Sequence, residues 1–239
     1  MQSKIPEPDQ SLFYKVIQYV EQYMNSGNFD GSHDFNHAKR VLGLSHLLYS
    51  QITKSSATED DASANPQPKL DLTIITLGAL LHDVGDKKYL KEGQDDEIMV
   101  RDLLLNFGAD PELAQIVQTV CLGVSYRSEI KNLGRVEELI RKHPELAVVQ
   151  DADRLDAIGA VGIGRVFTYG GARTKRGMDQ SIEIIEDKLL KLEALMKTVP
   201  GKRLAKERTD RLKTFREWWI DEVEVGELCP TIPKPGLNV

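Results

Sequence analysis

Apolar residues recur at helical spacing along most of the chain, and this pattern sets the expected fold. Near the N-terminus, large apolar side chains stand three, four and seven positions apart, at Leu12, Phe13, Val16, Ile17, Val20 and Met24. Such spacing is typical of one buried face of an α-helix. The same pattern predicts further helices over residues 34–49, 71–83, 95–107, 110–122, 144–167, 180–197 and 202–225. Convincing pairs of alternating strands are absent from the sequence, so we expect an all-α fold.

Two regions bear on the domain organisation. Residues 53–69, TKSSATEDDASANPQPK, carry no large apolar side chain and contain two prolines. Such a segment buries too little surface to offset its ordering entropy, so we expect a mobile insertion there. A chain of 239 residues is long enough for one domain with a sizeable core. We therefore expect a single domain over residues 1–239, with its core at about 9–172 and a helical C-terminal extension at about 180–225.

Composition and charge narrow the class of protein. The formal net charge of −6 argues against a nucleic-acid binder, which gains affinity from cationic contacts with phosphates. The apolar runs are too short to span a membrane, and no secretory signal is visible at the N-terminus. Two cysteines are too few for a disulfide framework or a cysteine zinc cluster. These features predict a soluble cytoplasmic protein, with a nuclear location left open, that binds neither nucleic acid nor a membrane.

Two short motifs bring histidines next to carboxylates on expected helices. In LLHDVGD, His82 and Asp83 continue a stripe that begins with apolar residues, and in SHDFNH, His37 begins the apolar stripe of its helix. A buried histidine and aspartate need partners, because an unpaired buried polar group is costly. A metal ion is one such partner, and an interaction between His82 and Asp83 themselves is another. Taken alone, His37 also fits a hydrogen-bonded core histidine, and His33 fits a helix cap or a surface residue.

A third motif, QDADRLDAIGA, adds a carboxylate to the middle of an apolar face. At 100° per residue, Asp153 lies on the face that contains Val149. Asp151 points away from that face, and Asp156 lies at its margin. An unpaired charge on an apolar face is disfavoured, so Asp153 is expected to meet a cation. That cation is either a metal ion or a buried arginine such as Arg40.

Together, the motifs supply two imidazoles and two carboxylates on separate helices, at His37, His82, Asp83 and Asp153. This set of nitrogen and oxygen ligands suits one divalent ion such as Mn²⁺, Fe²⁺, Zn²⁺, Mg²⁺ or Co²⁺. It also leaves coordination positions open for water and substrate.

The order H…HD…D, found here at His37, His82-Asp83 and Asp153, resembles the HD-domain metal-dependent phosphohydrolases. The SHDxxH, HDxxD and DADRLDAIGA motifs, with a following YGG, look like those of a small HD hydrolase subgroup, and the likeness covers about residues 9–172. The resemblance implies an HD-domain helical bundle with a metal held by those four residues. It also implies hydrolysis of a nucleotide or a similar small phosphate ester, with Mn²⁺ favoured and pyrophosphate released from nucleoside triphosphates.

Further residues near the motifs are candidates for the chemistry. Asp86 could position or deprotonate the attacking water, or it could only cap a helix. His33 could support a metal-site residue or act as an acid to the leaving group. Lys88, Arg40 and Arg154 are cations that could neutralise phosphate charge, although the usual role of a single lysine is a solvated surface charge.

Two other functions stay open on the sequence alone. An HD-type hydratase of a small non-phosphate substrate would not need Lys88 or Arg154, and a non-enzymatic nucleotide or metal sensor would show no turnover. A small-molecule phosphate, most simply a nucleotide, is the expected partner, and a homodimer is compatible with a helical bundle.

Overall fold

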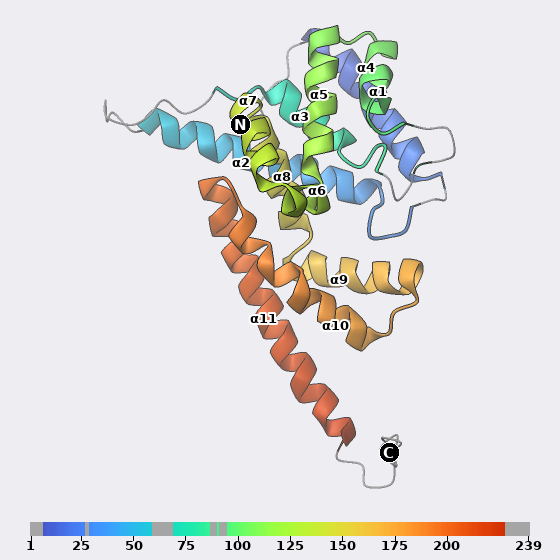
Figure 1. Ribbon diagram of the computed structural model, residues 1–239, viewed down its shortest axis with the longest axis vertical. Coiled ribbons are helices and arrows are strands. Elements are labelled where there is room, and N and C mark those ends of the chain that lie inside the picture. Colours follow the sequence, from blue (N-terminus) through green and yellow to red (C-terminus); the bar gives the residue numbers. More distant parts are fainter. Residues whose placement is uncertain (1–6, 27–28, 59–68, 87–89, 91–94, 228–239) are drawn as a thin grey trace.

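The computed structural model describes residues 7–26, 29–58, 69–86, 90 and 95–227, and in this part of the chain all regular structure is helical (Figure 1). The α-helices are α1 (Glu7–Met24), α2 (Phe35–Thr58), α3 (Leu72–Leu81), α4 (Met99–Asn106), α5 (Pro111–Val124), α6 (Tyr126–Lys131), α7 (Leu133–Lys142), α8 (Glu145–Asp156), α9 (Gly159–Tyr169), α10 (Met178–Asp187) and α11 (Val199–Glu227). The all-α prediction is therefore confirmed. Among the described helices, none is both long and apolar enough to cross a membrane.

Helices α3 and α8 form the centre of the bundle. Eight residues of α3, from Ile74 to Leu81, and eleven of α8 are buried. Helix α3 contacts α1, α2, α5 and α8, and α8 in turn contacts α2, α5 and α11. A helix that is covered on all sides must be apolar nearly all round, which is the character of the α3 sequence LTIITLGALL.

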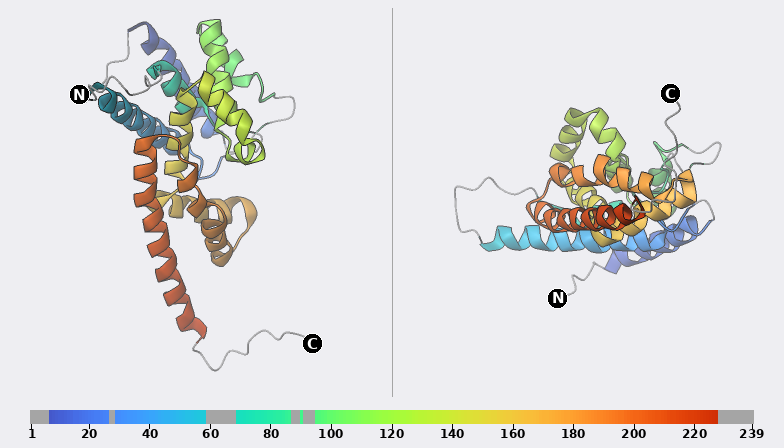
Figure 2. Two further views of the ribbon diagram at one scale, coloured as in Figure 1. Left: turned by 60° about the vertical axis from the view of Figure 1, so that its left-hand side comes forward. Right: turned by 90° about the horizontal axis from the view of Figure 1, so that it is seen from below.

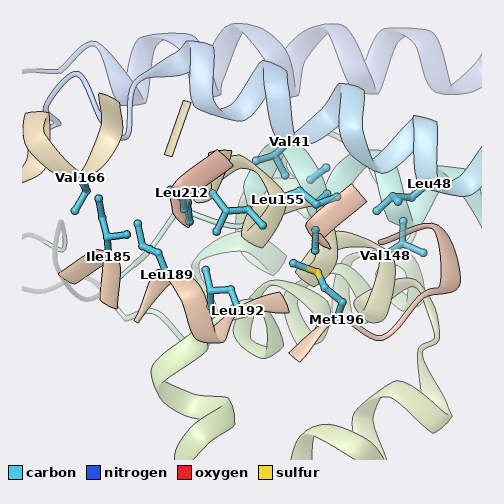
Figure 3. Close-up of a cluster of buried hydrophobic side chains, with 14 of the residues drawn as sticks. Val41, Leu48, Val148, Leu155, Val166, Ile185, Leu189, Leu192, Met196 and Leu212 are labelled. Atoms are coloured by element: carbon cyan, nitrogen blue, oxygen red, sulfur yellow. The ribbon is translucent and has the colours of Figure 1, made fainter. Parts of the chain in front are cut away.

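The apolar core lies on both sides of these two helices. One cluster joins α1, α4 and α5 to α3 through residues such as Val20, Leu80 and Val117. A second cluster joins α2 and α8 to the C-terminal helices and is drawn in Figure 3, where Leu155 of α8 lies close to Leu212 of α11. Because each cluster uses α3 or α8, these two helices hold a fixed position relative to the rest of the bundle.

Two carboxylates accept hydrogen bonds from the backbone at the starts of helices α3 and α11. The side chain of Asp71 accepts hydrogen bonds from the backbone of Thr73 and Ile74 and so caps α3. Asp151 of α8 accepts hydrogen bonds from the backbone N–H groups of Lys197 and Thr198, just before α11 begins. As expected from its helical position, Asp151 therefore faces away from Asp153, and it ties α8 to the start of α11.

The prediction of a single helix over residues 144–167 is wrong, because the helix is interrupted between α8 and α9. Gly159 has a φ of 73°, in the left-handed region that a side chain at Cβ disfavours. The break turns α9 onto a new direction, so that Ala157 is the C-cap of α8 rather than part of a continuous stripe.

Other boundaries also differ from the expected ones. Helix α2 continues through Thr58, so the first part of the expected mobile insertion is helical, and residues 59–68 lie outside the described residues. Helices α6 and α7 were not predicted. Helix α6 is only six residues long, and the apolar stripe of α7 at Val136, Leu139 and Ile140 was missed. The helix expected over 180–197 is α10 followed by two short 3₁₀ turns, Leu189–Lys191 and Glu193–Leu195.

The expected C-terminal extension is the long helix α11, which leaves the bundle as it proceeds. Its first half packs against the second core cluster through Ala205 and Leu212, and Phe215 and Trp219 lie against Phe167 of α9. Beyond this contact the last turns project away from the other described helices, as both Figure 1 and Figure 2 show.

The tight turn between α8 and α9 makes a matched pair of glycine substitutions informative. A Cβ at Gly162 would lie 2.2 Å from the backbone oxygen of Ala157, whereas a Cβ at Gly164 meets nothing within 4 Å. We expect Gly162→Ala to lower the free energy of unfolding by about 1–3 kcal/mol through this overlap. Gly164→Ala should raise it by up to about 1 kcal/mol, because alanine is the better helix former. Urea unfolding of both variants measures the difference, and equal stabilities would contradict the observed turn.

Candidate metal centre

The four predicted ligands come together from the ends of three helices. His37 lies in the first turn of α2, His82 is the C-cap of α3 with Asp83 directly after it, and Asp153 lies in the last turn of α8. After Asp83 the chain turns back at Gly85, whose φ of 81° again requires glycine. The C-terminal ends of α3 and α8 carry partial negative charge, which favours a cation between them.

The ligand atoms converge on one small volume. The Nε2 atoms of His37 and His82 are 3.1 Å apart. The Oδ2 atom of Asp83 lies 3.4 Å from Nε2 of His37 and 3.6 Å from Nε2 of His82. The Oδ1 atom of Asp153 lies 3.5 and 3.8 Å from the same two nitrogens. The imidazoles are fully buried, whereas the Asp153 side chain keeps 29% of its surface exposed, so the centre opens to solvent on that side.

Both imidazoles use their other nitrogen to hold this orientation. Nδ1 of His37 lies 2.8 Å from Oδ2 of Asp156, and Nδ1 of His82 lies 2.8 Å from the backbone oxygen of Ala79. A carboxylate and a carbonyl only accept hydrogen bonds, so each Nδ1 carries a proton and donates it. In the neutral form of each ring, Nε2 therefore carries a lone pair instead of a proton. The lone pairs of His37 and His82 face each other.

A divalent metal ion fits this arrangement. The buried Oδ2 atom of Asp83 has no hydrogen-bond partner, which is costly unless a cation satisfies it. Adjacent ligands of an octahedral ion with bonds near 2.1 Å are separated by about 3 Å, close to the spacing of the two imidazole nitrogens. His37, His82 and Asp83 form a ligand cluster, and Asp153 adds a fourth oxygen from its open side.

The charges of the site also suit a cation. Burial acts to raise the pKa of Asp83, but His82 and His37 outweigh it and hold that pKa well below its usual range. The same two imidazoles outweigh burial to lower the pKa of Asp153. Burial acts to lower the pKa of His37, but Asp156 and Asp83 outweigh it and raise that pKa. Two ionised carboxylates are thus available at neutral pH, and a metal competes with a proton for the imidazoles.

Asp156 is the functional residue that the sequence analysis missed. Its buried carboxylate accepts one hydrogen bond from Nδ1 of His37, two from Arg40 at 2.7 and 3.1 Å, and one from Arg165 at 3.0 Å. Burial acts to raise the pKa of Asp156, but His37 and Arg40 outweigh it and keep that pKa well below its usual range. Its spacing of one helical turn from Asp153 was the available signal, since that spacing brings it to the same end of α8.

The predicted substrate cations do not all reach the centre. Arg40 is engaged by Asp156, with about a third of its side chain still exposed. Arg154 is buried and contacts Glu129 and Gln150, a separate set of residues from the metal ligands. Lys88 lies outside the described residues. The structure therefore associates one of these three cations, Arg40, with the metal centre.

Asp86, the predicted partner of the attacking water, lies in the turn that follows the His-Asp pair. Its backbone N–H donates to the carbonyl of Asp83 at 3.3 Å. Burial is the main cause that raises the pKa of Tyr23, and the charges of Asp83 and Asp86 add to it. The Asp86 carboxylate is thus close to the same phenol as Asp83, a candidate metal ligand.

His33 lies beside the centre, as predicted. Its ring packs edge-on against the rings of His37 and Tyr169, each with a centroid distance of 5.7 Å. On its other side, Nδ1 lies 2.6 Å from Oγ of Ser32, and Ser32 is also hydrogen-bonded to Asp30. His33 thus belongs to a hydrogen-bonded chain that begins at a carboxylate.

The direction of this chain fixes the tautomer of neutral His33. Burial acts to raise the pKa of Asp30, but its hydrogen bonds to Ser32 and Arg173 outweigh burial and lower it. The ionised carboxylate only accepts, so the Ser32 hydroxyl donates its proton to Asp30 and accepts from His33. Neutral His33 therefore carries its proton on Nδ1 and has its lone pair on Nε2.

Comparison with known proteins agrees with this geometry. The HD domain family profile matches residues 34–158. The protein YpgQ of Bacillus subtilis is 34% identical over 209 residues, covering 84% of this chain and 90% of YpgQ. The crystal structure of YpgQ in complex with ADP matches with a TM-score of 0.61 at 27% identity, covering 97% of this chain and 99% of that one. An HD-superfamily hydrolase from Bacillus thuringiensis matches with a TM-score of 0.63 at 27% identity, over 90% of this chain and 98% of that one.

The hydrogen bond from His37 to Asp156 gives a prediction for metal affinity. Asp156→Asn keeps the size of the side chain but replaces the anionic acceptor that orients His37. We expect Mn²⁺ to bind about 10- to 100-fold more weakly, the usual effect of removing a carboxylate behind a metal-binding histidine. Isothermal titration of the metal-stripped protein measures this change.

Asp151→Asn is the matched control, because Asp151 lies on the same helix but contacts the start of α11. This variant should lose stability without losing Mn²⁺ affinity. An Asp156→Asn protein that binds Mn²⁺ as tightly as the wild type would contradict the orienting role of Asp156.

Proposed function

This chain belongs to the HD domain family, and from that premise we propose that it is a divalent-metal-dependent phosphohydrolase of nucleotides. We propose hydrolysis of nucleoside triphosphates to monophosphate and pyrophosphate, with Mn²⁺ as the favoured ion. The observation that carries the proposal is the convergence of imidazole and carboxylate atoms around the unpartnered Asp83 oxygen. The ADP complex of YpgQ supports a nucleotide ligand, and the Bacillus thuringiensis relative supports hydrolysis.

The residues at the centre would prepare the site for an ion. A divalent ion held by His37, His82, Asp83 and Asp153 would polarise a phosphoryl oxygen and lower the pKa of a coordinated water. The Nδ1 hydrogen bonds orient both imidazoles so that their Nε2 lone pairs would face the ion, and the two carboxylates would balance its charge. The exposed edge at Asp153 leaves access for water and substrate.

A surplus of positive charge beside the centre favours a phosphate substrate. One carboxylate, Asp156, faces the guanidinium groups of both Arg40 and Arg165. The three groups together carry one net positive charge, and the Arg40 side chain is partly exposed. Arg40 is therefore our candidate for a direct contact with the substrate phosphates. The buried contacts of Arg154 favour a structural role, and Lys88 stays a predicted phosphate ligand.

Two further side chains would handle protons. Protonated His33 can donate from Nε2 to the leaving oxygen, because Asp30, through Ser32, stabilises the charged ring. Asp86 is our candidate for positioning or deprotonating the attacking water.

A hydrolysis assay tests the proposed function directly. Metal-stripped protein reloaded with Mn²⁺ should release pyrophosphate from nucleoside triphosphates, with phosphate and pyrophosphate measured separately. Asp153→Ala removes one ligand and should abolish turnover, whereas Asp179→Ala, an exposed position on α10, should not. Phosphate release from monophosphates would instead indicate a nucleotidase. An absence of turnover with Mn²⁺ demonstrably bound would overturn the proposal and favour the hydratase or sensor alternative.

The role of His33 can be separated from metal binding. His33→Gln removes the proton donor, and we expect kcat to fall about 10²- to 10⁴-fold with the amount of bound Mn²⁺ unchanged. Ser32→Ala breaks the chain to Asp30 and should shift the pH profile of kcat while leaving turnover measurable. A His33→Gln enzyme with wild-type kcat would exclude His33 as the acid.

A further inference from the structure

The turn that carries His33 lies between α1 and α2, outside both helices. Within this turn, the N–H of Ser32 donates to the Asp30 carboxylate at 2.9 Å, and the N–H of His33 donates to the Asp30 carbonyl at 3.0 Å. These bonds shape the turn but do not fix its place in the bundle. A proton donor must lie within hydrogen-bond reach of the atom that it protonates, so the place of this turn matters for the proposed reaction.

One side of α9 faces this turn (Figure 1). Arg165, Tyr169 and Arg173 follow one another at intervals of four residues, the spacing that puts side chains on one side of a helix. The first two lie in α9, and Arg173 lies in the π-helical turn Gly170–Thr174 that continues it. Such π-helical turns are frequent at functional sites.

Tyr169 and Arg173 hold the His33 ring and the carboxylate behind it. The Tyr169 ring packs edge-on against the His33 ring. Nε of Arg173 donates to Oδ2 of Asp30 at 2.8 Å, whereas Oδ1 of the same carboxylate accepts from the backbone and the hydroxyl of Ser32. Arg173 therefore fixes the rotation of the Asp30 carboxylate, and with it the direction of the hydrogen-bonded chain that ends at the His33 ring.

Arg165 joins the same turn to the metal centre. Its Nε donates to the backbone oxygen of Ser32 at 2.7 Å, and its Nη1 donates to Oδ2 of Asp156 at 3.0 Å. That Asp156 oxygen also accepts from Nδ1 of His37, a candidate metal ligand. The guanidinium is planar and rigid, so a single group sets the separation between the peptide next to His33 and the carboxylate behind His37.

We propose that Arg165, Tyr169 and Arg173 are positioning residues, which hold His33 at a fixed place beside the metal centre so that it can protonate the leaving oxygen. This inference rests on the proposed function. As water forms the new bond to the α-phosphorus, the bond to the bridging oxygen breaks, and the Nε2 proton of His33 passes to that oxygen. The water gives up its own proton to Asp86, our candidate base.

A leaving group that needs no proton separates positioning from general damage. On a nucleoside triphosphate with Mn²⁺, Arg173→Ala should lower kcat about 10- to 100-fold, because the proton donor is displaced, with KM and Mn²⁺ affinity close to the wild type. On the p-nitrophenyl ester of a nucleoside monophosphate, nitrophenolate leaves unprotonated, so kcat should fall by less than about twofold. Lys175→Gln is the control, because it removes an exposed charge two residues away, and it should match the wild type on both substrates.

A double-mutant cycle adds a second criterion. Because Arg173 acts through His33, Arg173→Ala should change kcat by less than about twofold in the His33→Gln background. Tyr169→Leu should behave in the same way. Effects that multiply, or equal losses on the triphosphate and the ester, would overturn the proposal, since these residues would then act independently of the proton donor.

The place of the His33 ring can also be measured without turnover. In metal-stripped protein, the NMR signals of the His33 ring protons should shift in Arg173→Ala and in Tyr169→Leu. The signals of His46, which contacts Thr76, and of His143, at the end of α7, should stay in place. Unmoved His33 signals would overturn the proposal. Shifted signals in a protein that hydrolyses no phosphate would support the positioning contacts and overturn the proposed function instead.

Discussion

The convergence of four ligand-type atoms, with no proton donor to separate them, is the constraint on which the rest of the structure depends. Two imidazole lone pairs at 3.1 Å and a buried carboxylate oxygen without a partner are costly unless a metal ion or a proton lies between them. Two features of the fold hold these atoms in place, the burial of the central helices and the hydrogen bonds behind His37. Helices α3 and α8 are covered on all sides, and Asp156 fixes the ring of His37 while Arg40 and Arg165 fix Asp156.

The convergence of the four candidate ligands could be predicted from the sequence, because residue type and helical period were enough to bring them to one place. His82-Asp83 ends an apolar helix, and Asp153 interrupts an apolar face, so each required a polar partner in the interior. The role of Asp156 could not be predicted in this way. Its partner His37 is 119 residues away, and only the packing of α2 on α8 brings the two side chains together.

Two other features of the structure differ from the sequence-based expectation, because the apolar period carries no information about them. The break at Gly159 left no trace in the apolar period, because a glycine-rich helix and a helix broken by a left-handed glycine have similar sequences. Arg154 was taken for a phosphate ligand because it adjoins Asp153. At one residue of separation its side chain points about 100° away, where it meets Glu129 of α6, a helix that the period did not predict.

Helix α8 places three aspartates on three different tasks within six residues. Asp151 holds the start of α11, Asp153 faces the metal centre, and Asp156 holds His37. Insertion or deletion of one residue before Asp151 would turn all three carboxylates by about 100° at once. The loops around α8 can therefore vary in length, whereas α8 itself tolerates substitutions but not insertions or deletions. Its helical register relative to the bundle must stay the same for all three carboxylates to keep their contacts.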